Sequence, residues 1–96
     1  MATFVIDSSQ LDERRRRLVF RAWHRGIREM DLILGQYVDA HIHNMSDQTV
    51  SELEYIMSFD DSDLLEWITG KISPPSKVDS FLFRDIINYC FFKNFN

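Results

Sequence analysis

Residues 24–41, HRGIREMDLILGQYVDAH, place a glycine directly before the clearest helical pattern in the chain. The side chains expected to face a core recur at helical spacing, at Ile27, Met30, Leu34, Tyr37, Val38 and His41. A glycine inside a helix costs roughly 1 kcal/mol relative to alanine. We therefore interpret Gly26 as a helix junction: a first helix ends at Arg25, and Gly26 adopts a turn conformation that other residues resist.

Similar patterns predict a helix on either side of this segment. Before the junction, Leu11, Leu18 and Ala22 fall on one helical face. After it, Ser46 is suited to cap a third helix, because its hydroxyl can accept a hydrogen bond from a free backbone amide. The buried stripe of that helix is predicted to be Val50, Leu53 and Met57.

Two more helices are predicted in the C-terminal part of the chain. In SFDDSDLLEWITGK, residues 58–71, Asp60 or Asp61 caps a short helix and Gly70 ends it. Its inward side chains are predicted to be Leu64, Leu65 and Ile68. The prolines of SPPS, residues 73–76, indicate a turn. The last helix is nearly apolar all round, with predicted inward residues at Val78, Phe81, Leu82, Ile86, Tyr89 and Cys90.

No alternating strand pattern and no internal repeat accompany these helices. The predicted fold class is therefore all-α, a small five-helix bundle. A chain of 96 residues has room for a single domain with one modest core. We interpret residues 1–10 as a flexible N-terminal arm and residues 11–96 as the helical domain.

The sequence contains no pattern typical of a catalytic or metal site. His41 and His43 are two residues apart and point to different faces of a helix, and Cys90 lies on an apolar face. The acidic run at 60–63 lacks the spacing and the glycine of a calcium loop. There is no glycine-rich phosphate loop. We therefore predict no catalytic residue, no metal ligand and no cofactor held stably by this chain alone.

The charge is distributed unevenly along the chain. Residues 1–28 carry +4, including seven arginines, whereas residues 29–96 carry −8. The arginines at 14–17 are interpreted as a solvated face that pairs with Asp12, Glu13 or the acidic body. The alternative is that they dock an anionic partner, as in a small helical nucleic-acid-binding or regulatory module. The acidic net charge of −4 argues against strong generic nucleic-acid binding.

The charged residues around the junction indicate a docking corner. If Ile27 and Met30 face the core, then Arg25, Arg28 and Glu29 surround an exposed corner. The absent side chain at Gly26 would let the backbone of another protein approach closely. Arginine can donate paired hydrogen bonds there and a glutamate can accept them.

These residues also carry a resemblance to a known family. RGIRE, residues 25–29, resembles the Arg-Gly-x-x-Glu signature of the SdhE family, the FAD assembly factors of succinate dehydrogenase. A second pattern, Asp-x-Asp-Leu-x-x-Trp from Asp61 to Trp67, resembles the family's fourth helix. Together the similar segments cover roughly residues 14–71. Met30 stands where leucine is common in the family, which is a nearly isosteric change.

The resemblance implies a function as well as a five-helix fold. Proteins of this family bind the flavoprotein subunit of succinate dehydrogenase, and in bacteria also that of fumarate reductase. They promote covalent attachment of FAD to a histidine of that subunit without being enzymes, because the bond forms autocatalytically in the partner. The residues that this resemblance, together with the charged corner, assigns to partner binding are Arg25, Gly26, Arg28, Glu29 and Asp31.

The N-terminus has no pattern typical of a secretory signal, and the chain has none typical of a membrane span. MATFVIDSSQ has no basic stretch followed by an apolar one, and no apolar run is long enough to cross a bilayer. The lone Cys90 suits a reducing compartment. We expect a cytoplasmic protein of the bacterial type, with neither membrane nor nucleic acid as a partner.

Overall fold

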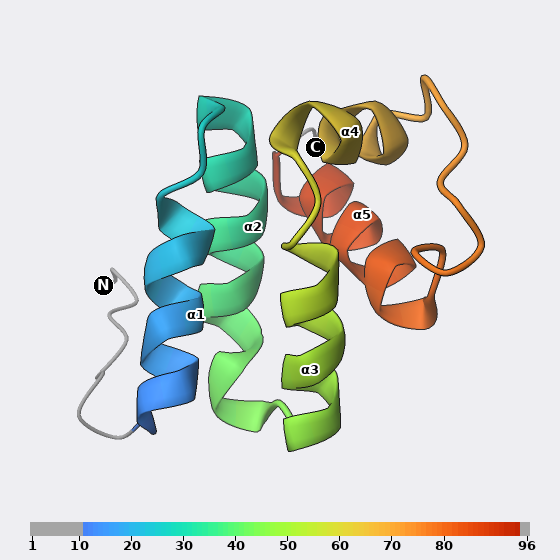
Figure 1. Cartoon of the computed structure of the whole chain (residues 1–96). Coiled ribbons are helices and arrows are strands. Elements are labelled where there is room, and N and C mark those ends of the chain that lie inside the picture. Colours follow the sequence, from blue (N-terminus) through green and yellow to red (C-terminus); the bar gives the residue numbers. More distant parts are fainter. Residues whose placement is uncertain (1–10, 95–96) are drawn as a thin grey trace.

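The structure is a computed structural model that describes residues 11–94. Within this range the chain forms α1 (Glu13–Trp23), α2 (Arg28–His41), a short 3-10 helix η2 (Ile42–Asn44), α3 (Asp47–Ile56), α4 (Asp61–Ile68) and α5 (Phe81–Asn94) (Figure 1). The predicted all-α fold with five helices is confirmed, and no strand occurs in the described part. The predicted arm at residues 1–10 lies outside the described residues.

The helices pack around one core. α1, α2 and α3 run side by side in alternating directions, and α4 lies across one end of this layer (Figure 1). α5 packs against both α2 and α3. The core contains residues from every α-helix, among them Leu18, Ala22, Met30, Leu34, Val38, Val50, Leu53, Leu64, Phe83 and Ile86. Among the described helices, none combines the length and the apolar character needed to cross a membrane.

Several helix ends follow the predicted local chemistry. The Ser46 hydroxyl accepts a hydrogen bond from the Thr49 amide at 3.1 Å, so Ser46 caps α3 as predicted. Asp12 caps α1 in the same way, through the Arg15 amide at 2.8 Å. Gly70 follows α4 with a φ of 82°, a left-handed conformation that favours glycine. Its predicted role in ending that helix is confirmed.

The predicted inward face of the last helix is partly wrong. Leu82, Ile86 and Cys90 are buried as expected, but Phe81 is 82% exposed, whereas Phe83 is completely buried. α5 begins at Phe81, after a turn in which the Ser80 hydroxyl accepts a hydrogen bond from the Phe83 amide at 3.2 Å. This start directs Phe81 outward. Because α5 has apolar residues on every face, the hydrophobic periodicity could not show which of the two phenylalanines is buried.

Gly35, in the middle of α2, lies against a side chain of α1. A Cβ atom built there would lie 2.5 Å from Cε2 of Trp23 and 2.7 Å from Cε3, so the indole packs directly on the α2 backbone. The indole Nε1 donates a hydrogen bond to Asp39 Oδ1 at 3.0 Å. Gly35 therefore lets Trp23, at the end of α1, pack directly on the middle of α2.

Candidate functional site

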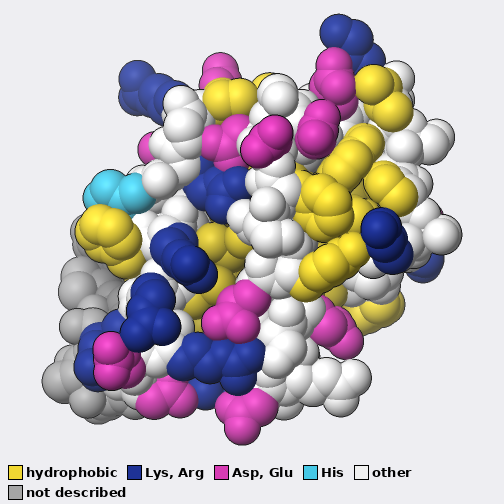
Figure 2. Space-filling view, in the orientation of Figure 1, with side chains coloured by type: hydrophobic (Ala, Val, Ile, Leu, Met, Phe, Trp, Pro, Cys, Tyr) yellow, Lys and Arg dark blue, Asp and Glu magenta, His cyan; other side chains and the backbone are white. Residues whose placement is uncertain are grey.

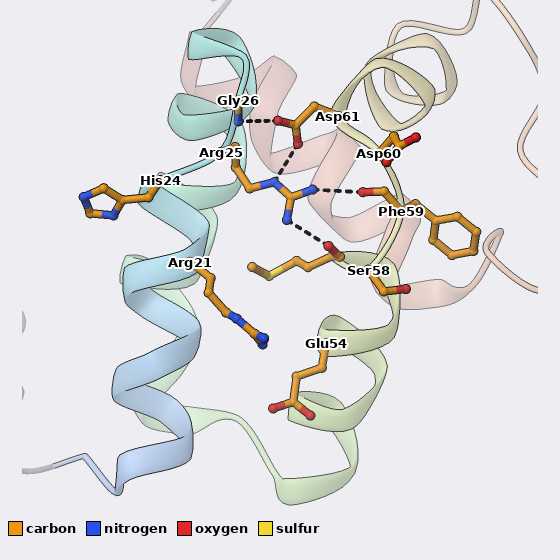
Figure 3. A pocket seen from close by; sticks show the side chains of 10 residues that line it. Arg21, His24, Arg25, Gly26, Glu54, Ser58, Phe59, Asp60 and Asp61 are labelled. Atoms are coloured by element: carbon orange, nitrogen blue, oxygen red, sulfur yellow. Dashed lines mark hydrogen bonds and ion pairs between the residues drawn. The ribbon is translucent and has the colours of Figure 1, made fainter.

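The predicted docking corner lies between two helix junctions. α1 ends at Trp23 rather than at Arg25, and residues 24–27 cross over to the start of α2 at Arg28. Opposite them, residues 57–60 join α3 to α4. The two connections face each other across a cleft of about 460 Å³ (Figure 3). It is lined by Arg21, His24, Arg25, Gly26, Glu54, Met57, Ser58, Phe59, Asp60 and Asp61.

The Arg25 guanidinium lies inside this corner and contacts the chain itself. Nε donates a hydrogen bond to Asp61 Oδ1 at 2.6 Å. Nη1 donates to the Met57 carbonyl at 2.8 Å and Nη2 to the Phe59 carbonyl at 2.9 Å (Figure 3). The Arg25 side chain is only 13% exposed. The guanidinium nitrogens therefore hold two carbonyls of the α3–α4 connection and the first residue of α4, which corrects the expectation that Arg25 lies exposed at the corner.

Asp61 completes this contact from the first turn of α4. Its Oδ2 accepts hydrogen bonds from the Gly26 amide at 2.5 Å and the Ile27 amide at 3.1 Å, while Oδ1 receives Arg25. The Asp61 side chain is 11% exposed. We call this set of contacts, Arg25 and Asp61 with the amides of residues 26 and 27 and the carbonyls of residues 57 and 59, the corner latch. It ties the α1–α2 junction to the α3–α4 connection.

The contacts of Asp61 in the corner latch differ from the role that the sequence suggested, in which Asp60 or Asp61 caps α4. Asp60 is the residue before α4, yet neither it nor Asp61 caps the helix through a side-chain hydrogen bond within the described residues. Asp60 points away from Arg25, whereas Asp61 turns toward it (Figure 3). Capping was therefore the wrong explanation for Asp61. The signal that pointed to its role was the second family-like pattern, which begins at this aspartate.

Gly26 has little space for a side chain on its inner side, and its backbone angle is not unusual. Gly70 is the only described residue with positive φ, so the predicted turn conformation at Gly26 is wrong. A Cβ atom at Gly26 would lie 3.3 Å from Asp61 Oδ2, tighter than an ordinary contact. Gly26 itself is exposed. The absent side chain lets the carboxylate reach the amide and leaves the outer side of the backbone open.

The remaining predicted site residues divide into an inner and an outer set. Asp31 is half-buried and accepts a hydrogen bond from the Arg25 amide at 2.5 Å, so it shapes the junction from α2. Arg28 and Glu29 are exposed on the first turn of α2. Neither side chain makes a hydrogen bond or ion pair with the part of the chain that the structure describes. Arg28, Glu29 and the open side of Gly26 are thus available to a partner.

The arginine run of α1 is largely paired within the molecule. Arg14 Nη2 lies 2.8 Å from Glu54 Oε1 of α3, and this hydrogen bond holds the pKa of Glu54 below its ordinary 4.5. Arg15 pairs with Asp12 at 2.7 Å and Asp47 at 2.9 Å. Arg17 pairs with Glu13 at 2.9 Å. The interpretation that these arginines pair with nearby acids and the acidic body is confirmed for these residues. Figure 2 shows Lys and Arg side chains lying beside Asp and Glu side chains at the lower left of the molecule.

The histidines and acidic residues bear on whether the chain could hold a metal ion. Among the described residues, no group of three or more histidine, cysteine, aspartate or glutamate side chains is arranged to hold a metal ion. His41 Nδ1 lies 2.8 Å from the Tyr37 carbonyl, and its ring stacks on the Tyr37 ring. His24, one of the residues that line the cleft, stacks on Phe20, and its ring is turned away from Arg25 (Figure 3). Both histidines therefore pack on neighbouring rings.

Comparison with known proteins connects this corner to a family. A sequence model of the family described as "Flavinator of succinate dehydrogenase" matches residues 16–90. The chain is 35% identical over 80 residues to the mitochondrial succinate dehydrogenase assembly factor 2 of Arabidopsis thaliana, covering 80% of this chain and 43% of that protein. It is 32% identical over 82 residues to the FAD assembly factor SdhE of Acetobacter pasteurianus, covering 85% of this chain and 75% of that protein.

A third relative, the mitochondrial succinate dehydrogenase assembly factor 2 of Schizosaccharomyces japonicus, is 32% identical over 92 residues, which cover 93% of this chain and 64% of that protein. The chain thus spans less than half of the plant relative and three quarters of the bacterial one. The family model includes both connections of the corner latch. By the extent of this match, the chain belongs to the family of succinate dehydrogenase flavinators, which includes the SdhE assembly factors.

Proposed function

We propose that this chain is an assembly factor that binds the flavoprotein subunit of succinate dehydrogenase and promotes covalent attachment of FAD to a histidine of that subunit. Fumarate reductase is proposed as a second client. Membership of the family and the names of its relatives, a succinate dehydrogenase assembly factor and an FAD assembly factor, support the role in assembly of succinate dehydrogenase. The bond-forming chemistry and the flavin belong to the partner, and this chain acts by binding.

One observation supports this proposal most strongly. The corner latch fixes the backbone on both sides of Gly26, while Arg28 and Glu29 project from the next turn without partners in the described chain. A surface that is held rigid before binding loses little conformational entropy when the complex forms. We therefore assign contact with the flavoprotein to Gly26, Arg28 and Glu29, and positioning of that contact to Arg25 and Asp31.

Binding of this kind can promote an autocatalytic reaction in the client. A factor that binds one conformation of the flavoprotein more tightly than others shifts the population toward it. If that conformation aligns the histidine with the flavin, the reaction gains from proximity without any catalytic group on this chain. Consistent with such a role, the proposed surface offers one cation, one anion and an open backbone.

The test mixes the purified chain with the apo flavoprotein subunit of succinate dehydrogenase and free FAD. Covalent flavin is then measured by its fluorescence in a denaturing gel. We expect the chain to raise covalent flavin above a reaction that lacks it, and equal flavin in both reactions would refute the proposal. A second reaction with the fumarate reductase flavoprotein tests that client separately.

Variants test which residues carry the effect. Glu29→Gln removes the charge of an exposed side chain, so we expect folding to be unchanged and flavin attachment to fall. Glu52→Gln is the matched control, because Glu52 is an exposed carboxylate on α3, away from the corner. Equal activity of these two variants would remove Glu29 from the contact.

A further inference from the structure

An apolar groove lies beside the proposed contact and has no role in the latch. It runs between the start of α2, the end of α4 and the visible end of α5, with a volume of about 570 Å³. This volume is within the range of roughly 300–1,000 Å³ that is typical of binding pockets. The groove is lined chiefly by Glu29, Leu32, Ile33, Leu65, Ile68 and Phe91.

The apolar walls of this groove are open to water. Leu32 is 42% exposed and Phe91 is 46% exposed, although Ile68 at the base is buried. Large apolar side chains gathered around a hollow are typical of a surface that another molecule covers, because their burial removes apolar area from water.

Glu29 indicates which molecule covers the groove. Among the described residues it is the only charged one in the lining, and its carboxylate has no hydrogen bond or ion pair with the described part of the chain. The same residue ends the Arg-Gly-x-x-Glu signature, so the groove is continuous with the proposed contact surface. One segment of a partner can therefore reach both.

We propose that the groove receives an amphipathic segment of the client flavoprotein. Its apolar side chains enter between Leu32 and Phe91, and a lysine or arginine of the same segment pairs with Glu29. A groove that takes apolar side chains at one end and a cation at the other fixes both the direction and the register of the bound segment. This proposal rests on the proposed function, since it defines how the same client is held.

Two variants remove the apolar walls without disturbing the core. Leu32→Ser and Phe91→Ala change partly exposed side chains, and Phe81→Ala is the matched control at the other end of α5, where the phenylalanine is 82% exposed. Circular dichroism and thermal melting confirm that each variant is folded. Affinity for the apo flavoprotein subunit of succinate dehydrogenase is measured by calorimetry, beside the flavin-attachment assay.

We expect the dissociation constant to rise at least about tenfold for Leu32→Ser and Phe91→Ala, as for central interface residues, and to stay within about twofold for Phe81→Ala. A photo-crosslinking residue at position 32 should attach to an apolar segment of the flavoprotein that contains lysine or arginine. Attachment to a second copy of this chain would overturn the proposal.

The outcomes separate this proposal from the function on which it rests. If the unmodified chain raises covalent flavin but both groove variants bind as tightly as it does, the groove proposal is wrong and the proposed function stands. If the unmodified chain neither binds the flavoprotein nor raises covalent flavin, both fail. Loss of affinity in all three variants, the control included, would also overturn the assignment to this groove.

Discussion

Replacement of Asp61 by alanine tests the corner latch most directly. The substitution removes the acceptor of three hydrogen bonds, one from the Arg25 guanidinium at 2.6 Å and two from backbone amides. Arg25 would keep its two carbonyl partners but would lose its counter-charge in a position where it is only 13% exposed. An unpaired charge in such a position is costly, because the folded chain screens it poorly.

The magnitude follows from the burial of the pair. Breaking a fully buried ion pair costs roughly 3–5 kcal/mol, and the residual exposure of 11% and 13% favours the lower end. We therefore expect Asp61→Ala to lower the free energy of unfolding by about 3 kcal/mol. For a domain of this size that corresponds to a fall in Tm of about 12–24 °C. The total free energy of unfolding of a typical domain is about 5–15 kcal/mol. The variant should therefore still fold at low temperature.

The assay is urea unfolding followed by helical circular dichroism, with Asp60→Ala as the control. Asp60 precedes α4, but its side chain makes no capping hydrogen bond. The latch predicts a loss of about 3 kcal/mol for Asp61→Ala and less than about 1 kcal/mol for Asp60→Ala. Equal losses of about 1 kcal/mol for both variants would refute the latch, since that result is what simple helix capping predicts.

Three further predictions concern other parts of the fold. Gly35→Ala places a Cβ atom against the Trp23 ring, so we expect it to destabilise the domain by about 1–2 kcal/mol in urea unfolding despite the better helix propensity of alanine. Burial and a 2.6 Å hydrogen bond to Asp85 raise the pKa of Tyr37 above its ordinary 10.0. Tyr37 therefore contributes stability below pH 10 that is lost as the pH rises further, and stability curves should show a smaller alkaline loss in Tyr37→Phe. The lowered pKa of Glu54 gives the opposite pH dependence. The difference in the free energy of unfolding between the native chain and Glu54→Gln should be present above pH 4.5 and shrink as the pH falls below 4.5. Urea unfolding at each pH measures this difference.

The helices could be predicted from the sequence because each has a local signal. Apolar residues at helical spacing identified the inward faces of α2 and α3, and Ser46 and Gly70 identified two helix ends by their own chemistry. The prediction failed at α5, where Phe81 and Phe83 are chemically identical and only the start of the helix decides which one is buried. Gly35 was also missed, because its requirement for a small residue arises from Trp23 on another helix.

In the candidate site, too, the sequence did not reveal contacts between residues that are far apart along the chain. The sequence placed Gly26, Arg28 and Glu29 at an exposed corner, and the structure does the same. It also placed Arg25 there, because Ile27 and Met30 were expected to face the core and the charged residues around them to face outward. Its partner Asp61 lies 36 positions away along the chain. No periodicity links residues at that separation, so local reasoning assigned the aspartate to its own helix instead.

The two charged ends of the Arg-Gly-x-x-Glu signature, which look alike in sequence, therefore differ in burial. Arg25 and Glu29 are four positions apart and both carry charge, yet the first is held by three partners within the chain and the second has none in the described part. Loss of Arg25 should act first through the stability of the corner, whereas loss of Glu29 should act through binding alone. A rigid frame beneath an unpartnered surface is the arrangement that recognition requires, because the energy of ordering the contact is supplied by folding and not by the partner.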